Sequence, residues 1–110
     1  MILLHIASEN DEALKNIAEL LLKNKLVADA RIDTIRRLLL NTSDQIEEVP
    51  RFLLMCKTKA TLFNTIVELI GANYNTRLPE IYALPLVAME QSQEEKLRKA
   101  TQSAEIQTGS

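Results

Sequence analysis

Two prolines stand in the segment TRLPEIYALPLVAM, residues 76–89, which otherwise has the apolar pattern of a β-strand. Proline lacks the backbone N–H that a central strand donates, so Pro79 and Pro85 restrict this strand to the edge of a sheet. Apolar residues nevertheless fall on both of its alternating faces. The chain must therefore build a sheet that has apolar side chains on both sides, even at its edge.

The hydrophobic periodicity elsewhere predicts strands alternating with helices. Ser8 or Asn10 is the expected N-cap of the first helix, and Thr58 that of the second. Residues 41–50 are expected to form a turn region that ends at Pro50. The expected elements are a strand at 1–8, a helix with an apolar stripe at 13–22, strands at 26–40 and 51–58, a helix with a stripe at 62–70, the proline-bearing strand and a short C-terminal helix.

This order predicts an α+β protein with a ferredoxin-like βαββαβ sandwich, an antiparallel sheet and a short C-terminal helix. In the expected arrangement the first and third strands lie parallel in the middle, and the second and fourth strands flank them. Residues 1–90 form one domain, and residues 91–110 form a short helix followed by a disordered tail.

Helices cover only one face of such a sheet, so the other face would be polar in a monomer. Depending on which face the helices take, the uncovered apolar residues are Leu3, Leu53, Met55, Leu84 and Leu86, or Ile2, Leu54, Ile81 and Val87. Burying five such side chains is worth on the order of 10 kcal/mol as an upper estimate. The sequence therefore predicts self-association.

Charge and cysteine content limit the possible binding partners and the cellular location. The 13 basic and 15 acidic residues give a net charge of −2, which attracts neither nucleic acid nor an anionic membrane. The apolar N-terminus has no basic region before it and is not expected to be a secretory signal, and no apolar run approaches membrane-spanning length. The single cysteine cannot form an internal disulfide, so we expect a cytoplasmic protein.

Three segments in register carry a resemblance to a known family. They are NIAELLLKNKLVADARI at 16–32, FLLMCKT at 52–58 and LPEIYALPL at 78–86. Together they resemble the CutA family of divalent-cation tolerance proteins over about residues 2–88. The resemblance implies a ferredoxin-like subunit in a homotrimer, with the long second and third strands joining sheets across subunits. It also implies kinship with PII-type signalling trimers, which bind small effectors between subunits.

The resemblance also suggests site residues. Lys57 and Glu80 match the family pattern, whereas Asp29 stands where a cysteine is usual and Tyr74 where a histidine is usual. Losing a thiolate and an imidazole removes ligands that copper favours. The resemblance thus implies a role in divalent metal tolerance, with a weakened ligand set for Cu²⁺ or another divalent cation and Glu80 as the retained metal ligand.

A small-ligand cleft is the main hypothesis for a site. Lys57, Arg77 and Glu80, with Tyr74 near and Asp29 as a further candidate, would contact the ligand at the connector before the fourth strand. The alternative is a structural ion pair that orients the turn into this strand. A PII-like regulator would bind an anionic metabolite or nucleotide in clefts between subunits.

Catalysis has no visible machinery in the sequence. There is no nucleophile–base set, glycine-rich phosphate loop or HExxH motif, so we expect no enzyme. His5 is the only histidine, and a lone histidine within a strand is more often structural than a metal ligand. Cys56 adjoins Lys57, which would lower a thiol pKa, but a cysteine in an apolar strand is more often an inert filler.

Two further charged groups have alternative interpretations. Asp29, Arg31 and Asp33 are expected on one face of the second strand, where they would hold a cation or ligand groups, or form a row of ion pairs across strands or between subunits. Arg36 and Arg37 near the hairpin would receive an anion or keep the strand edge from pairing wrongly.

Overall fold

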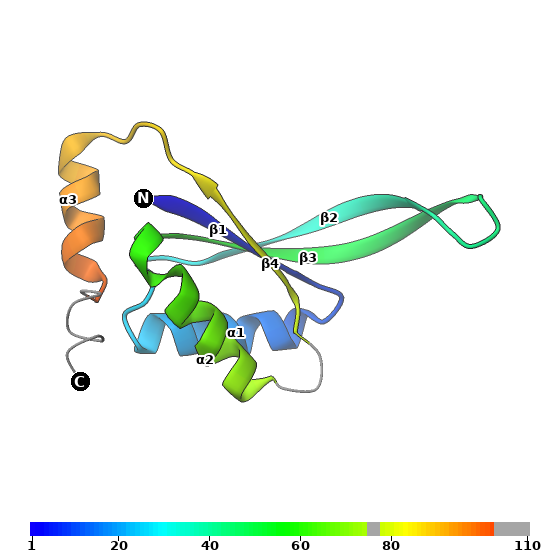
Figure 1. Ribbon diagram of the computed structural model, residues 1–110, viewed down its shortest axis with the longest axis horizontal. Coiled ribbons are helices and arrows are strands. Elements are labelled where there is room, and N and C mark those ends of the chain that lie inside the picture. Colours follow the sequence, from blue (N-terminus) through cyan, green and yellow to red (C-terminus); the bar gives the residue numbers. More distant parts are fainter. Residues whose placement is uncertain (75–77, 103–110) are drawn as a thin grey trace.

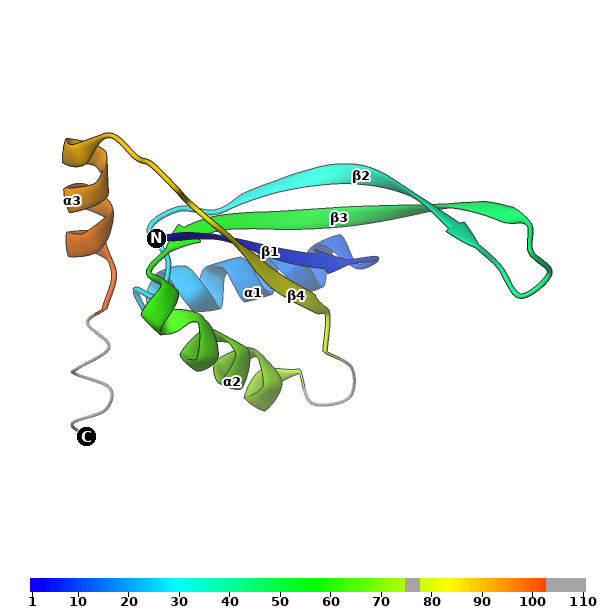
Figure 2. The ribbon, with the colours of Figure 1, turned by 45° about the horizontal axis from the view of Figure 1, so that its top comes forward.

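The computed structural model describes residues 1–74 and 78–102, and it confirms the α+β ferredoxin-like fold with a C-terminal helix (Figure 1). The elements are β1 (Ile2–Ser8), α1 (Asp11–Lys23), β2 (Arg31–Leu40), β3 (Ile46–Thr58), the 3₁₀ turn η1 (Ala60–Leu62), α2 (Phe63–Asn73), β4 (Glu80–Pro85) and α3 (Gln91–Ala100). The strand order is β2-β3-β1-β4. Helices α1 and α2 lie on one side of the sheet, and α3 stands beyond its end (Figures 1 and 2).

The central strands correct one expectation. β1 and β3 are neighbours, as predicted, but they run antiparallel, with Ile2 opposite Thr58 and Ser8 opposite Phe52. The reason lies in the connections. Helix α1 returns the chain so that β2 runs in the same direction as β1, and the β2–β3 hairpin then reverses it. A third strand inserted between β1 and β2 must oppose both.

The start of β2 is a second correction, because the strand begins at Arg31 and not at residue 26. Leu26 and Val27 are neighbours in sequence and both are buried. A strand directs successive side chains to opposite faces, so a non-strand connector places these two residues in the core. Lys25 precedes them at a φ of 54°, which turns the chain out of α1.

The start of β3 is a third correction, since the expected turn at 41–50 narrows to 41–45. The side chain of Asn41 accepts hydrogen bonds from the backbone N–H groups of Ser43 and Gln45, which forms this tight turn. Pro50 lies inside β3, opposite Arg36. Because β1 pairs with β3 only from Phe52 onward, β3 has an open edge at Pro50 where a missing N–H breaks no ladder.

The edge position predicted for the proline-bearing strand is confirmed. β4 pairs only with β1 and closes one side of the sheet. The strand is shorter than its apolar pattern, because Pro79 precedes its first residue and Pro85 is its last. The prolines thus bound the strand as well as placing it.

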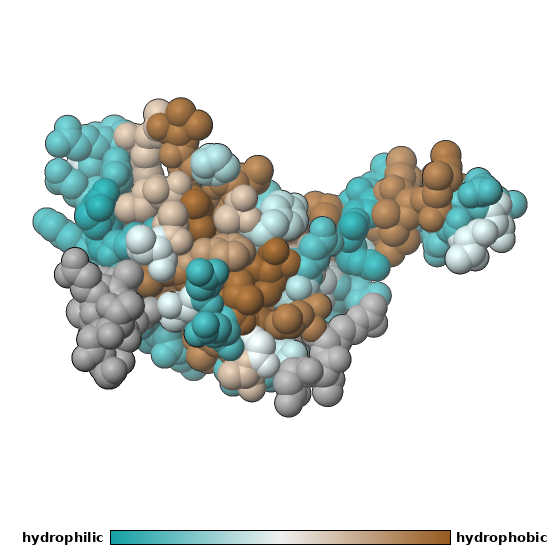
Figure 3. Space-filling model, viewed as in Figure 1, coloured by the Kyte–Doolittle hydropathy of each residue, from teal (hydrophilic) through white to brown (hydrophobic). Residues whose placement is uncertain are grey.

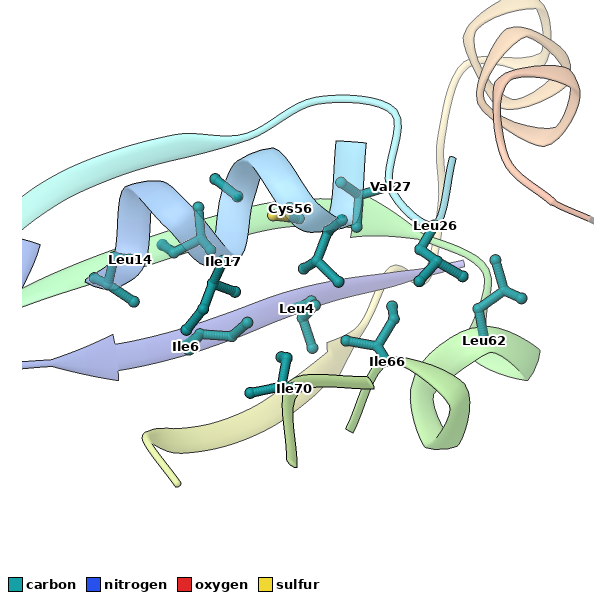
Figure 4. Close-up of a cluster of buried hydrophobic side chains, with 13 residues drawn as sticks. Leu4, Ile6, Leu14, Ile17, Leu26, Val27, Cys56, Leu62, Ile66 and Ile70 are labelled. Carbon is teal, nitrogen blue, oxygen red and sulfur yellow. The ribbon is translucent and has the colours of Figure 1, made fainter. Parts of the chain in front are cut away.

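The helices cover the sheet through the predicted apolar stripes. Asn10 is the N-cap of α1, and its side chain accepts from the N–H of Ala13 at 3.1 Å. Figure 4 shows side chains from β1, β3 and both helices meeting in one cluster. The buried core comprises Leu4, Ile6, Leu14, Ile17, Ala18, Leu21, Leu26, Val27, Leu54, Cys56, Leu62, Ile66 and Ile70. Thr58 does not cap α2; it donates to the carbonyl of Leu26 at 2.5 Å inside this core.

The far part of the β2–β3 hairpin, residues 35–51, forms an arm that no other strand of the described residues flanks. Figures 1 and 2 show it projecting away from the helices. The molecule is therefore elongated, with extents of 50 × 32 × 20 Å. Leu38, Leu40 and Ile46 are largely exposed on the arm.

Helix α3 is fastened to the body at its C-terminal end. Leu97 and Thr101 are buried, and the ammonium group of Lys59 donates to the carbonyls of Thr101 and Gln102 at 3.1 and 2.8 Å. A cation at this end of a helix satisfies carbonyls that lack intrahelical partners. The tail expected after this helix lies mostly outside the described residues.

Candidate functional site

The face of the sheet away from α1 and α2, called the open face here, carries two rows of mostly apolar side chains across β3, β1 and β4. His5 lies between Met55 and Tyr82, and Leu3 lies between Lys57 and Leu84. Leu53 and Leu86 complete the first of the two sets predicted to be uncovered, and all of its apolar members are partly or largely exposed in the single chain. Figure 3 shows apolar surface over the arm and over the middle of the body in its view.

His5 occupies the middle of the open face and contacts a tyrosine. Its Nδ1 lies 3.2 Å from the hydroxyl of Tyr82, and the two rings meet edge to face at 5.2 Å. Its Nε2 is buried and has no hydrogen-bond partner among residues 1–74 and 78–102. The part of the chain that the structure describes gathers no group of three His, Cys, Asp or Glu side chains that could hold a metal ion. The contact with Tyr82 supports a structural role for His5, which stays a prediction.

Cys56 lies on the helix-covered face, 1% exposed. Burial, and to a lesser extent the negative charge of Asp29, raise the pKa of its thiol to about 12. A thiol of this kind is neutral at physiological pH and unreactive. The expected position of Cys56 as a core filler is confirmed, and its inertness stays a prediction.

The predicted ligand residues fall into two separate hollows of the single chain. Asp29 and Lys57 line the first, the α3 hollow, of about 320 Å³ between α3 and the nearby sheet end. The Asp29 carboxylate accepts from the backbone N–H of Lys57 at 3.4 Å, while the ammonium of Lys96 belongs to the same lining. Asp29 precedes β2, so it does not share a strand face with Arg31 and Asp33 as expected.

Tyr74 and Glu80 line the second hollow, called the arm hollow, of about 370 Å³. It lies where β1 leads into α1, where α2 ends and where the arm leaves the body. Arg77 lies outside the described residues. Opposite β1, Lys57 pairs with Leu3 and Glu80 with Ala7, which separates the two by about 13 Å along the strand. One chain alone therefore does not bring Lys57 to Glu80.

Ion pairs account for most of the charged residues singled out in the sequence. Glu80 pairs with Arg37, whose Nη1 donates to the carboxylate at 2.8 Å. Arg36 donates from Nε to Glu48 at 2.5 Å across the hairpin. Arg31 lies 3.5 Å from Asp33 within β2. Arg31 and Asp33 thus form an ion pair along β2 and not the expected row across strands. The pair between Arg37 and Glu80 lies at the start of β4, where a structural ion pair was the alternative interpretation.

Sequence reasoning missed Arg51 and Glu9, whose charged groups lie 3.8 Å apart at the arm hollow. Arg51 pairs in register with Ile35, and Arg37 pairs with Val49, so the two arginines are diagonal neighbours on one face of the hairpin. If Pro50 had been assigned to the strand, the hairpin register would have placed Arg51 and Arg37 on the same face. The expected turn at 41–50 concealed this signal.

Comparison with protein families identifies one match. A family profile described as "CutA1 divalent ion tolerance protein" covers residues 2–99. No curated protein sequence matches the chain significantly. Within the described residues, no helix is long and apolar enough to cross a membrane.

Solved structures similar to this chain carry the same description. CutA1 from Pyrococcus horikoshii has a TM-score of 0.78 at 21% identity, over 94% of this chain and 100% of that one. CutA1 from Oryza sativa has a TM-score of 0.78 at 26% identity, over 93% and 94%. The periplasmic divalent cation tolerance protein CutA from Archaeoglobus fulgidus has a TM-score of 0.77 at 23% identity, over 91% and 98%.

Proposed function

Because the chain belongs to the CutA1 family of divalent ion tolerance proteins, we propose that it acts as a homotrimer that binds a small ligand or metal ion in the response to divalent metals. The role is binding and not catalytic. The observation that carries the assembly is the open face, where no helix of the described residues covers Leu3, Leu53, Met55 or Leu84. The number of subunits comes from the family resemblance.

The arm gives a second reason for assembly. A two-stranded ribbon with both edges open is marginal in water, and this one carries exposed apolar residues near its tip. A neighbouring subunit could pair with the open edges of the arm and cover Leu38 and Ile46. It would then satisfy the unpaired backbone groups and bury the exposed apolar side chains. The same assembly would therefore cover both the open face and the arm.

Sedimentation velocity at micromolar concentration tests the assembly. We expect a particle of about three times the chain mass of 12.4 kDa. Leu84→Glu, which places a charge on the open face, should dissociate it. Leu22→Glu is the matched control, because Leu22 is a leucine of similar exposure, 40% against 44%, on the outer side of α1. A particle of single-chain mass in the unaltered protein contradicts the proposal.

Any metal affinity should be weak. Asp29 and Tyr74 lie in different hollows of the chain, and Glu80 is already paired with Arg37. We expect calorimetric titration with Cu²⁺ or Zn²⁺ to give dissociation constants weaker than micromolar. Sub-micromolar Cu²⁺ binding that disappears in Glu80→Ala would overturn this part of the proposal and identify Glu80 as a ligand.

A second candidate function is PII-like regulation by an anionic metabolite or nucleotide. The arm hollow favours it, because two arginines line one cavity. A ligand that prefers the native state raises its melting temperature. A flat thermal-shift response across such compounds would exclude this candidate.

We propose a cytoplasmic location, and subcellular fractionation tests it against the periplasmic location described for the Archaeoglobus fulgidus relative.

A further inference from the structure

The arm hollow is bordered by two ion pairs of the same kind. Arg37 and Arg51 come from the arm, and their partners Glu80 and Glu9 come from the body. Both arginine side chains are mostly buried, with 34% and 22% of the side chain exposed, so their charges lie in a partly desolvated environment. Two cations and two anions thus surround one cavity and join the arm to the body.

The rest of the lining is largely apolar. Ala7 at the end of β1, Ala13 and Ile17 on α1 and Leu78 before β4 contribute to it, and the ring of Tyr74 borders it. A volume of about 370 Å³ accommodates a molecule of metabolite size. Such a ligand would place charged groups at the ion pairs and a short apolar group on this lining.

The charges around the hollow select the class of ligand. A simple anion would meet the carboxylates of Glu9 and Glu80, and a simple cation would meet both arginines. A guanidinium group has five N–H donors, so the ion pair between Arg37 and Glu80 leaves donors for a ligand carboxylate. A molecule with one carboxylate and one ammonium group can add partners to both kinds of side chain without breaking either pair.

We propose that the arm hollow binds a zwitterionic small molecule, an α-amino acid with a short aliphatic side chain. Its carboxylate contacts Arg37 and Arg51, its ammonium group contacts Glu9 and Glu80, and its side chain lies against the apolar lining. This inference rests on the second candidate function, a regulator that binds a small ligand, and replaces its anionic ligand with a zwitterionic one. The ligand bridges arm and body, so it also fixes the direction in which the arm projects.

Isothermal titration of the full chain with three related compounds tests the charge requirement. L-valine carries both charges, N-acetyl-L-valine lacks the ammonium group, and L-valine amide lacks the carboxylate. We expect valine to bind and each derivative to bind about tenfold more weakly or worse, because each loses charge-assisted hydrogen bonds. Equal binding of a derivative, or no binding of valine at millimolar concentration, overturns the proposal.

Variants of the hollow locate the binding. Arg51→Gln should weaken valine binding about tenfold or more. Arg36→Gln is the matched control, because Arg36 lies beside Arg37 in β2 but pairs with Glu48 and does not line the hollow. Equal losses in the two variants place the ligand elsewhere and overturn the proposal. Circular dichroism of each variant separates loss of binding from loss of fold.

A second variant tests the same site if the Arg51→Gln protein does not fold. Glu9→Gln should weaken valine binding and leave N-acetyl-L-valine unchanged or bound more tightly, since it removes a carboxylate that repels the anion. Weakening of both compounds to the same extent contradicts the assigned orientation. Sedimentation of the same samples measures assembly separately. A trimer that does not bind valine overturns only this inference, and a monomer that binds valine overturns only the proposed trimer.

Discussion

The two faces of β3 have similar side chains and different surroundings. Leu54 and Cys56 point toward the helices and are buried, whereas Leu53 and Met55 point away and remain partly exposed. Both sets are apolar, so alternation alone does not show which face the helices cover. The difference shows that an apolar side chain indicates burial but does not identify which element buries it. The covered face is completed within the chain, and the proposed assembly would complete the open face with another copy.

The clearest test of this contrast is chemical labelling of the two neighbouring sulfur residues. The raised thiol pKa of about 12 leaves roughly a thousandfold less thiolate than an ordinary cysteine at the same pH. Native Cys56 should therefore resist iodoacetamide at pH 8 and react after unfolding. Because the folded pKa lies above the ordinary cysteine value of 9.0, the associated stability is complete below pH 9 and is lost as the pH rises toward 12.

Met55 provides the comparison for Cys56. Peroxide oxidation of Met55, followed by peptide mass spectrometry, should be slow in the assembled protein and faster in the Leu84→Glu variant. Labelling of Cys56 should be the same in both. Rapid labelling of Cys56 in the native chain would show that the helix-covered face opens readily, and the contrast between the faces would fail.

Truncation of neighbouring leucines measures the same difference as free energy. Leu54→Ala should lower the free energy of unfolding by about 2–5 kcal/mol, because Leu54 is completely buried beneath the helices. Leu53→Ala should act through assembly, so its effect should shrink when the protein is diluted. Urea unfolding at several protein concentrations distinguishes them. Losses of equal size that do not change with dilution would contradict the assignment of the two faces.

Much of the fold could be predicted because its signals are local. The cap at Asn10 follows from residue type, and the edge position of β4 follows from Pro79 and Pro85. Both failures at strand boundaries arose where tertiary contacts override the pattern. Leu26 extends an alternating series but enters the core through a connector, and Pro50 resembles a strand breaker but lies where β3 has a free edge.

The candidate site was less accessible from the sequence, because its ion pairs join segments that are distant along the chain. Arg51 meets Glu9, and Arg37 meets Glu80, only through the register of the hairpin and the packing of α1. The sequence nominated Arg37 and Glu80 separately and not as a pair, and it did not nominate Arg51 or Glu9. Residue types can nominate charged groups, but only the register of the strands shows which ones meet.

A polar group on the helix-covered face gives a smaller effect. Thr58 is completely buried, and its hydroxyl donates to the Leu26 carbonyl. Thr58→Val keeps the shape but leaves that carbonyl without this donor, which should cost about 1–3 kcal/mol in urea unfolding. Thr34→Val on exposed β2 is the control and should stay within about 0.5 kcal/mol. Equal losses would show that the hydrogen bond does not hold the connector to β3.

The smallest expected effect extends the comparison from the two faces to the two capped helices. The neutral side chain of Asn10 caps α1, which lies on the sheet, whereas the carboxylate of Glu90 caps α3, which stands beyond the sheet end. Hydrogen bonds from the Ser92 hydroxyl and the Gln93 N–H hold the pKa of Glu90 below its usual value. The cap is therefore fully effective above the usual glutamate pKa and weakens as the pH falls through the lowered folded value.

Amide hydrogen exchange read residue by residue along α3 measures this dependence. Protection in its first turn should fall on acidification in the unaltered protein, whereas Glu90→Gln should remove most of the change and α1 should show none from its own cap. Equal pH dependence in both helices would mean that the acid response comes from the body and not from the cap. A helix fastened by a titratable cap at one end and by Lys59 at the other would then be less independent of the sheet than its position beyond the sheet end suggests.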